Sequence, residues 1–206
     1  MGEPQDPQVR DSVQAFRRAM RVRLIAARQA LPARARSRGS AAIERHLERL
    51  LERLAAGVIG FCWPIRGEYD PRALMARLVA QGRKVALPVL VAESAALDFR
   101  EWVPGAAMDA DRYGIPFPAQ GRRVHPDVIV IPVVGFDAAG FRLGYGGGYF
   151  DRSMAALDPR PIAVGTGFEL GRIDSIRPRP HDIPMDWVVT ETGMFRRRSS
   201  GLSAEE

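Results

Sequence analysis

The chain has 206 residues, of which 46% are hydrophobic and 26% are charged, as in an ordinary soluble globular protein. This length suits one well-buried domain and is short for two. The sequence holds no apolar run near the roughly 18 residues of a membrane span, and its polar N-terminus has no signal-peptide pattern. We therefore expect a cytoplasmic protein without membrane contact. The single cysteine, Cys62, excludes an internal disulfide bond.

The positive charge of the chain is concentrated near its N-terminus. The net charge is +6, and residues 10–53 contain 12 arginines against four acidic residues. A basic helical region of this kind can bind nucleic acid or small anionic ligands. The arginines are not interleaved with exposed aromatic residues, and no nucleic-acid-binding motif is present. A nucleic-acid-binding module is therefore the less favoured of the two interpretations.

Apolar periodicity predicts an alternation of helices and strands. Helices are expected at residues 12–31, 37–54, 71–81 and 149–157. Strands are expected at residues 58–63, 84–87, 97–102, 127–134, 161–165 and 187–190. Ser12 can cap the first helix and Pro32 stops it, while the section from the third strand to Pro126 is predicted to be rich in loops.

This order of elements predicts the fold class. Continuous apolar strands that alternate with helices are typical of a mostly parallel sheet covered by helices on both faces. We expect a single three-layer α/β domain over residues 12–196. The polar segments 1–11 and 197–206 are predicted to be disordered tails.

A glycine-rich segment follows the apolar strand at 127–134. It reads Arg142-Leu-Gly-Tyr-Gly-Gly-Gly-Tyr-Phe-Asp151-Arg152 and leads into the helix predicted at 149–157. Glycines without Cβ atoms let successive backbone N–H groups point into one concavity, which suits phosphate between a strand and a helix. The segment is neither a Walker A loop nor the dinucleotide-binding fingerprint. On glycine content alone, a hairpin turn between Phe141 and Tyr149 is an equally good interpretation.

The ordered set Arg-Leu-Gly-x-Gly-x-Gly-Tyr-aromatic-Asp resembles the signature of the 5-formyltetrahydrofolate cyclo-ligase family, also called 5,10-methenyltetrahydrofolate synthetases. Further segments in the same order are similar to other blocks of that family: Arg17-Arg18-Ala-Met-Arg21, Tyr113-Gly-Ile-Pro-Phe-Pro118, Pro132-Val-Val-Gly-Phe-Asp137, Arg179-Pro-His-Asp182 and Val188-Val-Thr-Glu191. The resemblance covers about residues 15–195. It implies ATP-dependent cyclisation of 5-formyltetrahydrofolate to 5,10-methenyltetrahydrofolate, with ATP and a reduced folate as partners and Mg²⁺ as cofactor.

The resemblance also implies a set of site residues. The residues expected to bind ATP are Arg17, Arg21, Arg142, Gly144, Tyr145, Gly146, Gly147, Gly148, Tyr149, Phe150 and Arg152. Those expected to bind the folate are Trp63, Glu68, Tyr145, Gly148 and Tyr149. Arg142 and Tyr149 are expected to contribute to catalysis, and Asp151 and Asp182 to hold Mg²⁺.

Several of these residues also have a simpler interpretation. Asp151 in the first turn of a helix complements the helix dipole, and Asp182 could be a turn residue between prolines. Arg17 and Arg21 are four residues apart and could be surface charges on one helix face. Glu68 could be a solvated loop carboxylate or a helix-start residue.

Three positions depart from the family pattern. Phe117 and Gly171 stand where the family often has glutamate and glutamine, and Phe150 replaces a frequent tyrosine. The first two departures keep open an ATP-dependent enzyme of the same fold that acts on another formyl or amide compound. We expect the protein to be a monomer.

Overall fold

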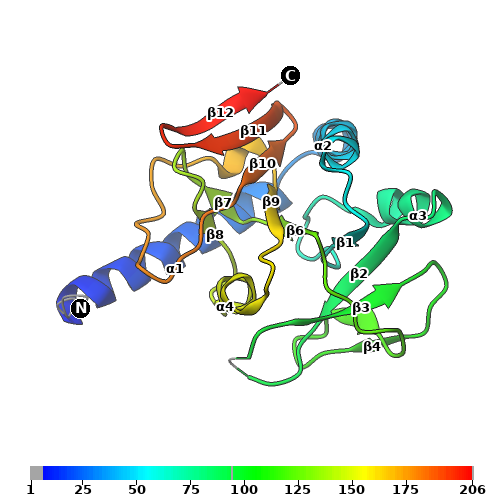
Figure 1. Cartoon of the computed structure of the whole chain (residues 1–206). Coiled ribbons are helices and arrows are strands. Elements are labelled where there is room, and N and C mark those ends of the chain that lie inside the picture. The colour runs from blue at the N-terminus through cyan, green and yellow to red at the C-terminus, as the bar shows by residue number, and fades with distance from the viewer. Residues whose placement is uncertain (1–6, 94, 206) are drawn as a thin grey trace.

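An eight-stranded sheet runs through the computed structural model, which describes residues 7–93 and 95–205. Its strands lie in the order β12-β11-β10-β9-β6-β1-β2-β3 (Figure 1). Their bounds are β1 (Val58–Gly60), β2 (Lys84–Val89), β3 (Asp98–Trp102), β6 (Val128–Pro132), β9 (Ile162–Thr166), β10 (Trp187–Thr190), β11 (Gly193–Arg198) and β12 (Gly201–Glu205). The strands from β10 to β2 pair in parallel, and β3, β11 and β12 add antiparallel edges.

Helices cover both faces of this sheet. They are α1 (Pro7–Gln29), α2 (Ala33–Leu54), α3 (Arg72–Ala80) and α4 (Tyr149–Ala156). Strand β6 shows the two faces, because successive side chains of a strand point to opposite sides. Val128 and Val130 share a core cluster with residues of α2 and α3, whereas Ile129 and Ile131 share another with Met154 of α4. The mostly parallel sheet and the helices on both faces confirm the predicted α/β fold.

Short elements complete the chain around the sheet. Strands β4 (Met108–Ala110) and β5 (Pro116–Pro118) form a hairpin inside the section predicted to be loops. Strands β7 (Gly135–Phe136) and β8 (Arg142–Leu143) form a second hairpin, and a 3-10 turn, η1, spans Glu169–Gly171.

The structure corrects the predicted tail at residues 197–206. Residues 197–198 end β11, residues 199–200 form a turn and residues 201–205 form β12. An antiparallel edge strand can leave polar side chains in water. The backbone N–H of Leu202 also donates to the carbonyl of Ala138 at 2.7 Å, and Glu205 pairs with Arg53 and Arg198. The polar sequence of this segment therefore reflects an edge position and not disorder.

The structure also changes the N-terminal boundaries. The first helix begins at Pro7, so part of the tail predicted at 1–11 is helical, and residues 1–6 lie outside the described part of the chain. The second helix begins at Ala33, four residues before its predicted start, because Pro32 stands at its N-cap with φ −55° and ψ 141°. Proline suits a helix start, since the first N–H groups of a helix lack intrahelical partners.

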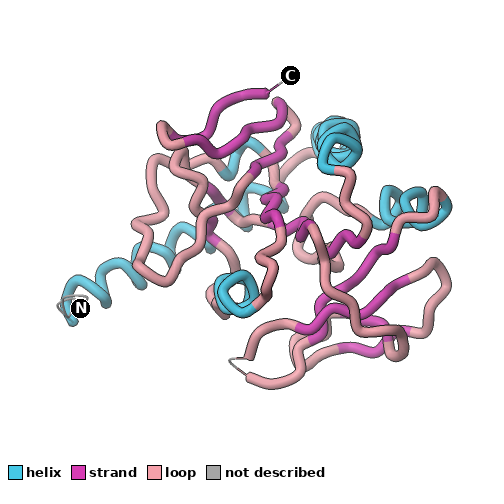
Figure 2. Tube along the Cα trace, in the orientation of Figure 1, coloured by secondary structure: helices cyan, strands magenta, loops and turns pink. Residues whose placement is uncertain are grey.

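Helix α1 lies against the β7–β8 hairpin and the long segment 172–186. Leu24 packs with Val134, Leu143 and Ile176 in a small separate core. In Figure 2 the long connection before β10 passes beside α1 as a loop. Within residues 7–93 and 95–205, no helix has the length and apolar character to cross a membrane.

Candidate functional site

The glycine loop, residues 144–148, connects β8 to α4. The turn between Phe141 and Tyr149 is thus a strand-to-helix loop, since the nearby β-hairpin turns earlier, between β7 and β8. Gly146 and Gly148 have φ values of 98° and 67°, in the left-handed region that favours glycine. A Cβ on Gly147 would lie 2.5 Å from the ring of Tyr149. Three positions of the loop therefore require glycine for local reasons.

Helix α1 directs a row of arginines toward this loop. Arg17, Arg21 and Arg28 lie on one helix face because they are four and seven residues apart. Nε of Arg21 donates to the carbonyl of Gly144 at 2.7 Å. Burial and the positive charges of Arg17 and Arg18 lower the pKa of Arg21. Arg17 and Arg21 are therefore part of the loop's surroundings and not freely solvated charges.

Glu68 is buried beside the loop, with 2% of its side chain exposed. Its Oε1 accepts a hydrogen bond from the hydroxyl of Tyr145 at 2.5 Å, and its Oε2 accepts one from the N–H of Ile65 at 2.9 Å. Burial raises the pKa of Glu68, while these hydrogen bonds and the charge of Arg28 oppose that rise. The interpretation of Glu68 as a solvated carboxylate is wrong.

Two aspartates lie close to the loop, each beside an arginine. Oδ1 of Asp151 accepts from the N–H of Ile183 at 2.9 Å and lies 2.8 Å from Nη2 of Arg142. Nη2 of Arg142 is buried, and it forms this ion pair without making a hydrogen bond. Asp182 is held by both Nη atoms of Arg17 and by the N–H of Arg179.

The electrostatics of Asp182 differ from those of a free turn residue. Burial alone would raise the pKa of its carboxyl, but the hydrogen bonds from Arg17 and from the Arg179 N–H hold that pKa below its usual value. Since Asp151 bonds the backbone of Ile183, the chain segment that carries Asp182 is fastened beside α4.

The carboxylates near the glycine loop fit the ligand preference of Mg²⁺. Among the described residues, no three His, Cys, Asp or Glu side chains gather as a metal cage. Mg²⁺ needs no such cage, because it usually binds one or two carboxylates together with substrate phosphates and water. Asp151 and Asp182 are 21% and 12% exposed in their side chains. Two accessible carboxylates near a glycine loop fit this ion.

The remaining residues predicted at the loop make the following contacts. Arg142 donates to the carbonyl of Ile183 at 2.8 Å, and Arg152 donates to that of Gly147 at 2.9 Å. The guanidinium of Arg152 lies 4.9 Å from the centroid of the Tyr149 ring. Phe150 packs against the core cluster on the α4 face of the sheet.

The contacts of the glycine loop described above do not include Trp63 or two of the residues that depart from the family pattern, Phe117 and Gly171. Trp63 packs against the core of the α2 and α3 face and lies under Arg72, whose guanidinium is 5.1 Å from the ring centroid. Phe117 belongs to the β4–β5 hairpin and faces Arg100. A Cβ on Gly171 would meet the carbonyl oxygen of Val134 at 3.1 Å, so glycine at this position is explained by close backbone packing.

Two residues of this region were missed in the sequence. Arg28 donates to the Tyr145 hydroxyl at 2.8 Å, and the hydroxyl of Tyr113 lies 3.1 Å from that of Tyr149. The helical spacing from Arg17 through Arg21 to Leu24 could have indicated Arg28. Tyr113 stands in a segment that the family resemblance had already singled out.

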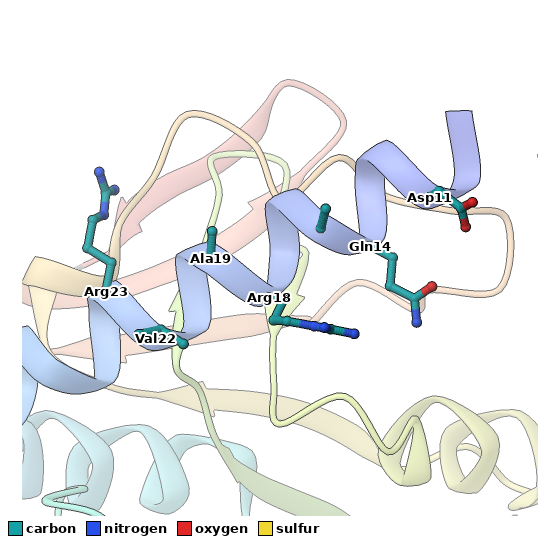
Figure 3. A pocket seen from close by; sticks show the side chains of 7 residues that line it. Asp11, Gln14, Arg18, Ala19, Val22 and Arg23 are labelled. Carbon is teal, nitrogen blue, oxygen red and sulfur yellow. The ribbon is translucent and has the colours of Figure 1, made fainter. Parts of the chain in front are cut away.

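A depression of about 660 Å³ lies elsewhere, on another face of α1 (Figure 3). It is lined by Asp11, Gln14, Ala15, Arg18, Ala19, Val22 and Arg23. Successive turns of one helix cannot enclose a ligand, so this is a surface feature of α1. The glycine loop, with converging arginines and carboxylates, has the chemistry of a site for a phosphorylated ligand.

Comparison with known proteins gives a consistent result. The profile of the 5-formyltetrahydrofolate cyclo-ligase family matches residues 13–191. The 5-formyltetrahydrofolate cyclo-ligase of Haemophilus influenzae is 29% identical over 150 residues, which cover 69% of this chain and 80% of that protein. The Escherichia coli K12 protein of the same name is 34% identical over 136 residues, covering 63% and 75%.

A solved structure agrees in fold. The NMR structure of Aquifex aeolicus 5,10-methenyltetrahydrofolate synthetase has a TM-score of 0.76 at 28% identity, and the match covers 93% of this chain and 97% of that one. The family match spans most of the sequence and includes the glycine loop and Arg17, Arg21 and Arg28 of α1. This chain therefore belongs to the 5-formyltetrahydrofolate cyclo-ligase family.

Proposed function

We infer that the glycine loop binds the terminal phosphates of ATP while this chain converts 5-formyltetrahydrofolate to 5,10-methenyltetrahydrofolate, with release of ADP and phosphate. The cyclo-ligase activity follows from family membership and from relatives near 30% identity over most of the chain. The observation that carries the site assignment is the loop itself, whose left-handed glycines lie beside Arg21 and Arg152.

The phosphate end of the site is formed by the loop and its arginines. Backbone N–H groups at a helix N-terminus favour anions, and guanidinium groups bind phosphate oxygens in pairs. We assign this role to the ATP-binding residues named above, from Arg17 and Arg21 on α1 to Arg142 and Arg152. The hydroxyl of Tyr149 lies 3.1 Å from that of Tyr113 and is assigned to substrate contact.

The folate end is assigned to Glu68, Tyr145 and Trp63. A pterin ring presents N–H donors, and an ionised carboxylate has only acceptors, so Glu68 is suited to recognise that ring. Burial strengthens such a contact because water competes less for it.

Asp151 and Asp182 are the residues that would hold Mg²⁺. When bound, the ion supplies positive charge that neutralises the phosphate oxygens. Arg142 and Arg17, which pair with these carboxylates, are themselves assigned to the phosphates.

The reaction needs a better leaving group than an amide-like oxygen. The formyl oxygen attacks the terminal phosphorus of ATP, the bond to the bridging oxygen breaks, and ADP leaves. The neighbouring amine then attacks the activated carbon, loses its proton, and phosphate departs with the former formyl oxygen. The protein contributes position and charge neutralisation, so the arginines and the loop N–H groups suffice without a nucleophilic side chain.

Substitution of a loop glycine tests the phosphate assignment. Gly146→Ala places a side chain at φ 98°, and the matched control Gly82→Ala places one at φ 82° in the turn after α3. Both substitutions should cost about 1–2 kcal/mol of unfolding free energy. Only Gly146→Ala should raise the KM for ATP, measured by the absorbance of the methenyl product. Equal ATP kinetics in the two variants would contradict the assignment.

A further inference from the structure

Arg28 is a buried charge at the centre of the site, and the known signature of the loop does not include it. Only 3% of this residue is exposed. Its guanidinium donates to the carbonyls of Arg66 and Val133 and to the hydroxyl of Tyr145, and it lies 3.8 Å from Oε1 of Glu68. It thereby joins α1 to the glycine loop and to the loop that carries Glu68.

Stability alone does not account for an arginine at this position. Leu24, one turn earlier on the same helix face, packs in an apolar core. Replacing a buried ion pair by apolar residues of similar volume is often neutral or stabilising, because two charges must be removed from water. A buried arginine that contacts two residues assigned to substrate therefore points to a role in binding.

Hydrogen-bond directions show what Arg28 does. Arginine has donors only, so the hydroxyl oxygen of Tyr145 must accept a hydrogen bond from Arg28. The single hydroxyl proton of Tyr145 is then donated to Glu68. We propose that Arg28 is a positioning residue, which orients the Tyr145 hydroxyl and keeps the Glu68 carboxylate as an acceptor for N–H donors of the reduced folate. This proposal rests on the assigned role of Glu68 in folate binding.

The affinity for folate should depend on pH because ionisable groups surround Glu68. Arg28 from α1, Arg66 from the same loop, Tyr145 from the glycine loop and the thiol of Cys62 are the ionisable groups that act on it or feel its charge. Burial raises the pKa of Glu68, and Arg28 opposes this. Since the ionised carboxylate is the form that accepts from the folate, folate binds tightly above the pKa of Glu68. Its affinity falls as the pH drops through that pKa. Without Arg28, this loss begins at a higher pH.

The test compares Arg28→Met with Arg28→Lys across the pH range in which the protein stays folded. Arg28→Met should raise the KM for 5-formyltetrahydrofolate about tenfold or more, as expected for one lost charge-assisted hydrogen bond. The KM for ATP should stay near its original value, and the acid limit of folate binding should move to higher pH. Arg28→Lys keeps the charge and should keep that acid limit, with a smaller rise in KM. The exposed Arg23→Met on α1 is the control and should match the original enzyme.

Further variants separate the possible failures. If Arg28→Met does not fold, the double variant Arg28→Met with Glu68→Gln removes both buried charges. This double variant should fold and should be stabilised by ATP against thermal unfolding. It should nevertheless bind folate weakly. Glu68→Gln with an unchanged folate KM would overturn the assignment of Glu68 itself. A raised folate KM in Glu68→Gln but not in Arg28→Met would overturn only the role of Arg28. Equal losses of kcat and of both affinities, without a pH shift, would show that Arg28 is merely structural.

Discussion

At the scale of single residues, pairing decides what each charge can do. Arg142, with 6% of its side chain exposed, faces Asp151, and Arg17 binds Asp182. The types and positions of these residues could be read from the sequence. Their mutual pairing could not, because Arg17 and Asp182 are 165 residues apart and meet only once the fold is complete.

Asp151→Asn should reduce turnover far more than stability. The amide oxygen can still accept from the Ile183 N–H, but the charge opposite the buried Arg142 is lost. We expect a cost of about 1–3 kcal/mol in unfolding free energy, above what the helix dipole alone would suggest. Asp186→Asn is the matched control, because Asp186 also pairs with an arginine, Arg160, and accepts a backbone N–H. Denaturation and product absorbance should separate the two variants; a comparable loss of turnover in both would refute the catalytic-site assignment of Asp151.

At the scale of elements, the apolar pattern predicted the central strands and helices because they are buried. Strand β6 is the clearest case, with four consecutive apolar residues that divide between two cores. The hairpins β4–β5, β7–β8 and β11–β12 were missed. The first two are short two-stranded sheets outside the main sheet, and the third is its polar edge, so none of them has a long apolar pattern. Tertiary contacts, and not local periodicity, hold these elements in place.

The attachment of α1 to segment 172–186 should weaken at acid pH. The pKa of Asp182 is lowered in the folded protein by its hydrogen bonds from Arg17 and Arg179. The ionised carboxylate therefore stabilises the fold fully at pH values above the pKa of an unfolded aspartate, about 3.9. This stabilisation is lost as the pH falls through the lower pKa of the folded state. Asp182→Asn should therefore flatten the acid side of a plot of unfolding free energy against pH. An unchanged acid slope would show that the pairing is energetically minor.

At the scale of the whole molecule, one mixed sheet carries the site on its connecting loops. Strand β12 is the outer strand at which another chain could add, because the outer side of β3 is already covered by residues 122–124. The N–H of Glu101 donates to the carbonyl of Arg122, and the N–H of Val124 donates to that of Phe99. Strand β12 is five residues long and carries Glu205 in ion pairs with Arg53 and Arg198. Short, charged edge strands disfavour pairing between molecules.

The protein should accordingly be a monomer in solution. Light scattering coupled to size-exclusion chromatography should give a mass near 22.7 kDa. A stable mass of twice that value at micromolar concentration would contradict this prediction.

Tyr145 has one further consequence for how the two substrates affect each other. Its backbone belongs to the loop assigned to the nucleotide, while its hydroxyl is fixed to the carboxylate assigned to the pterin. We therefore expect that a shift of the loop when nucleotide binds would move the Tyr145 hydroxyl, and with it the Glu68 carboxylate assigned to the pterin. Thermodynamic linkage then makes the influence reciprocal: the factor by which nucleotide changes folate affinity equals the factor by which folate changes nucleotide affinity.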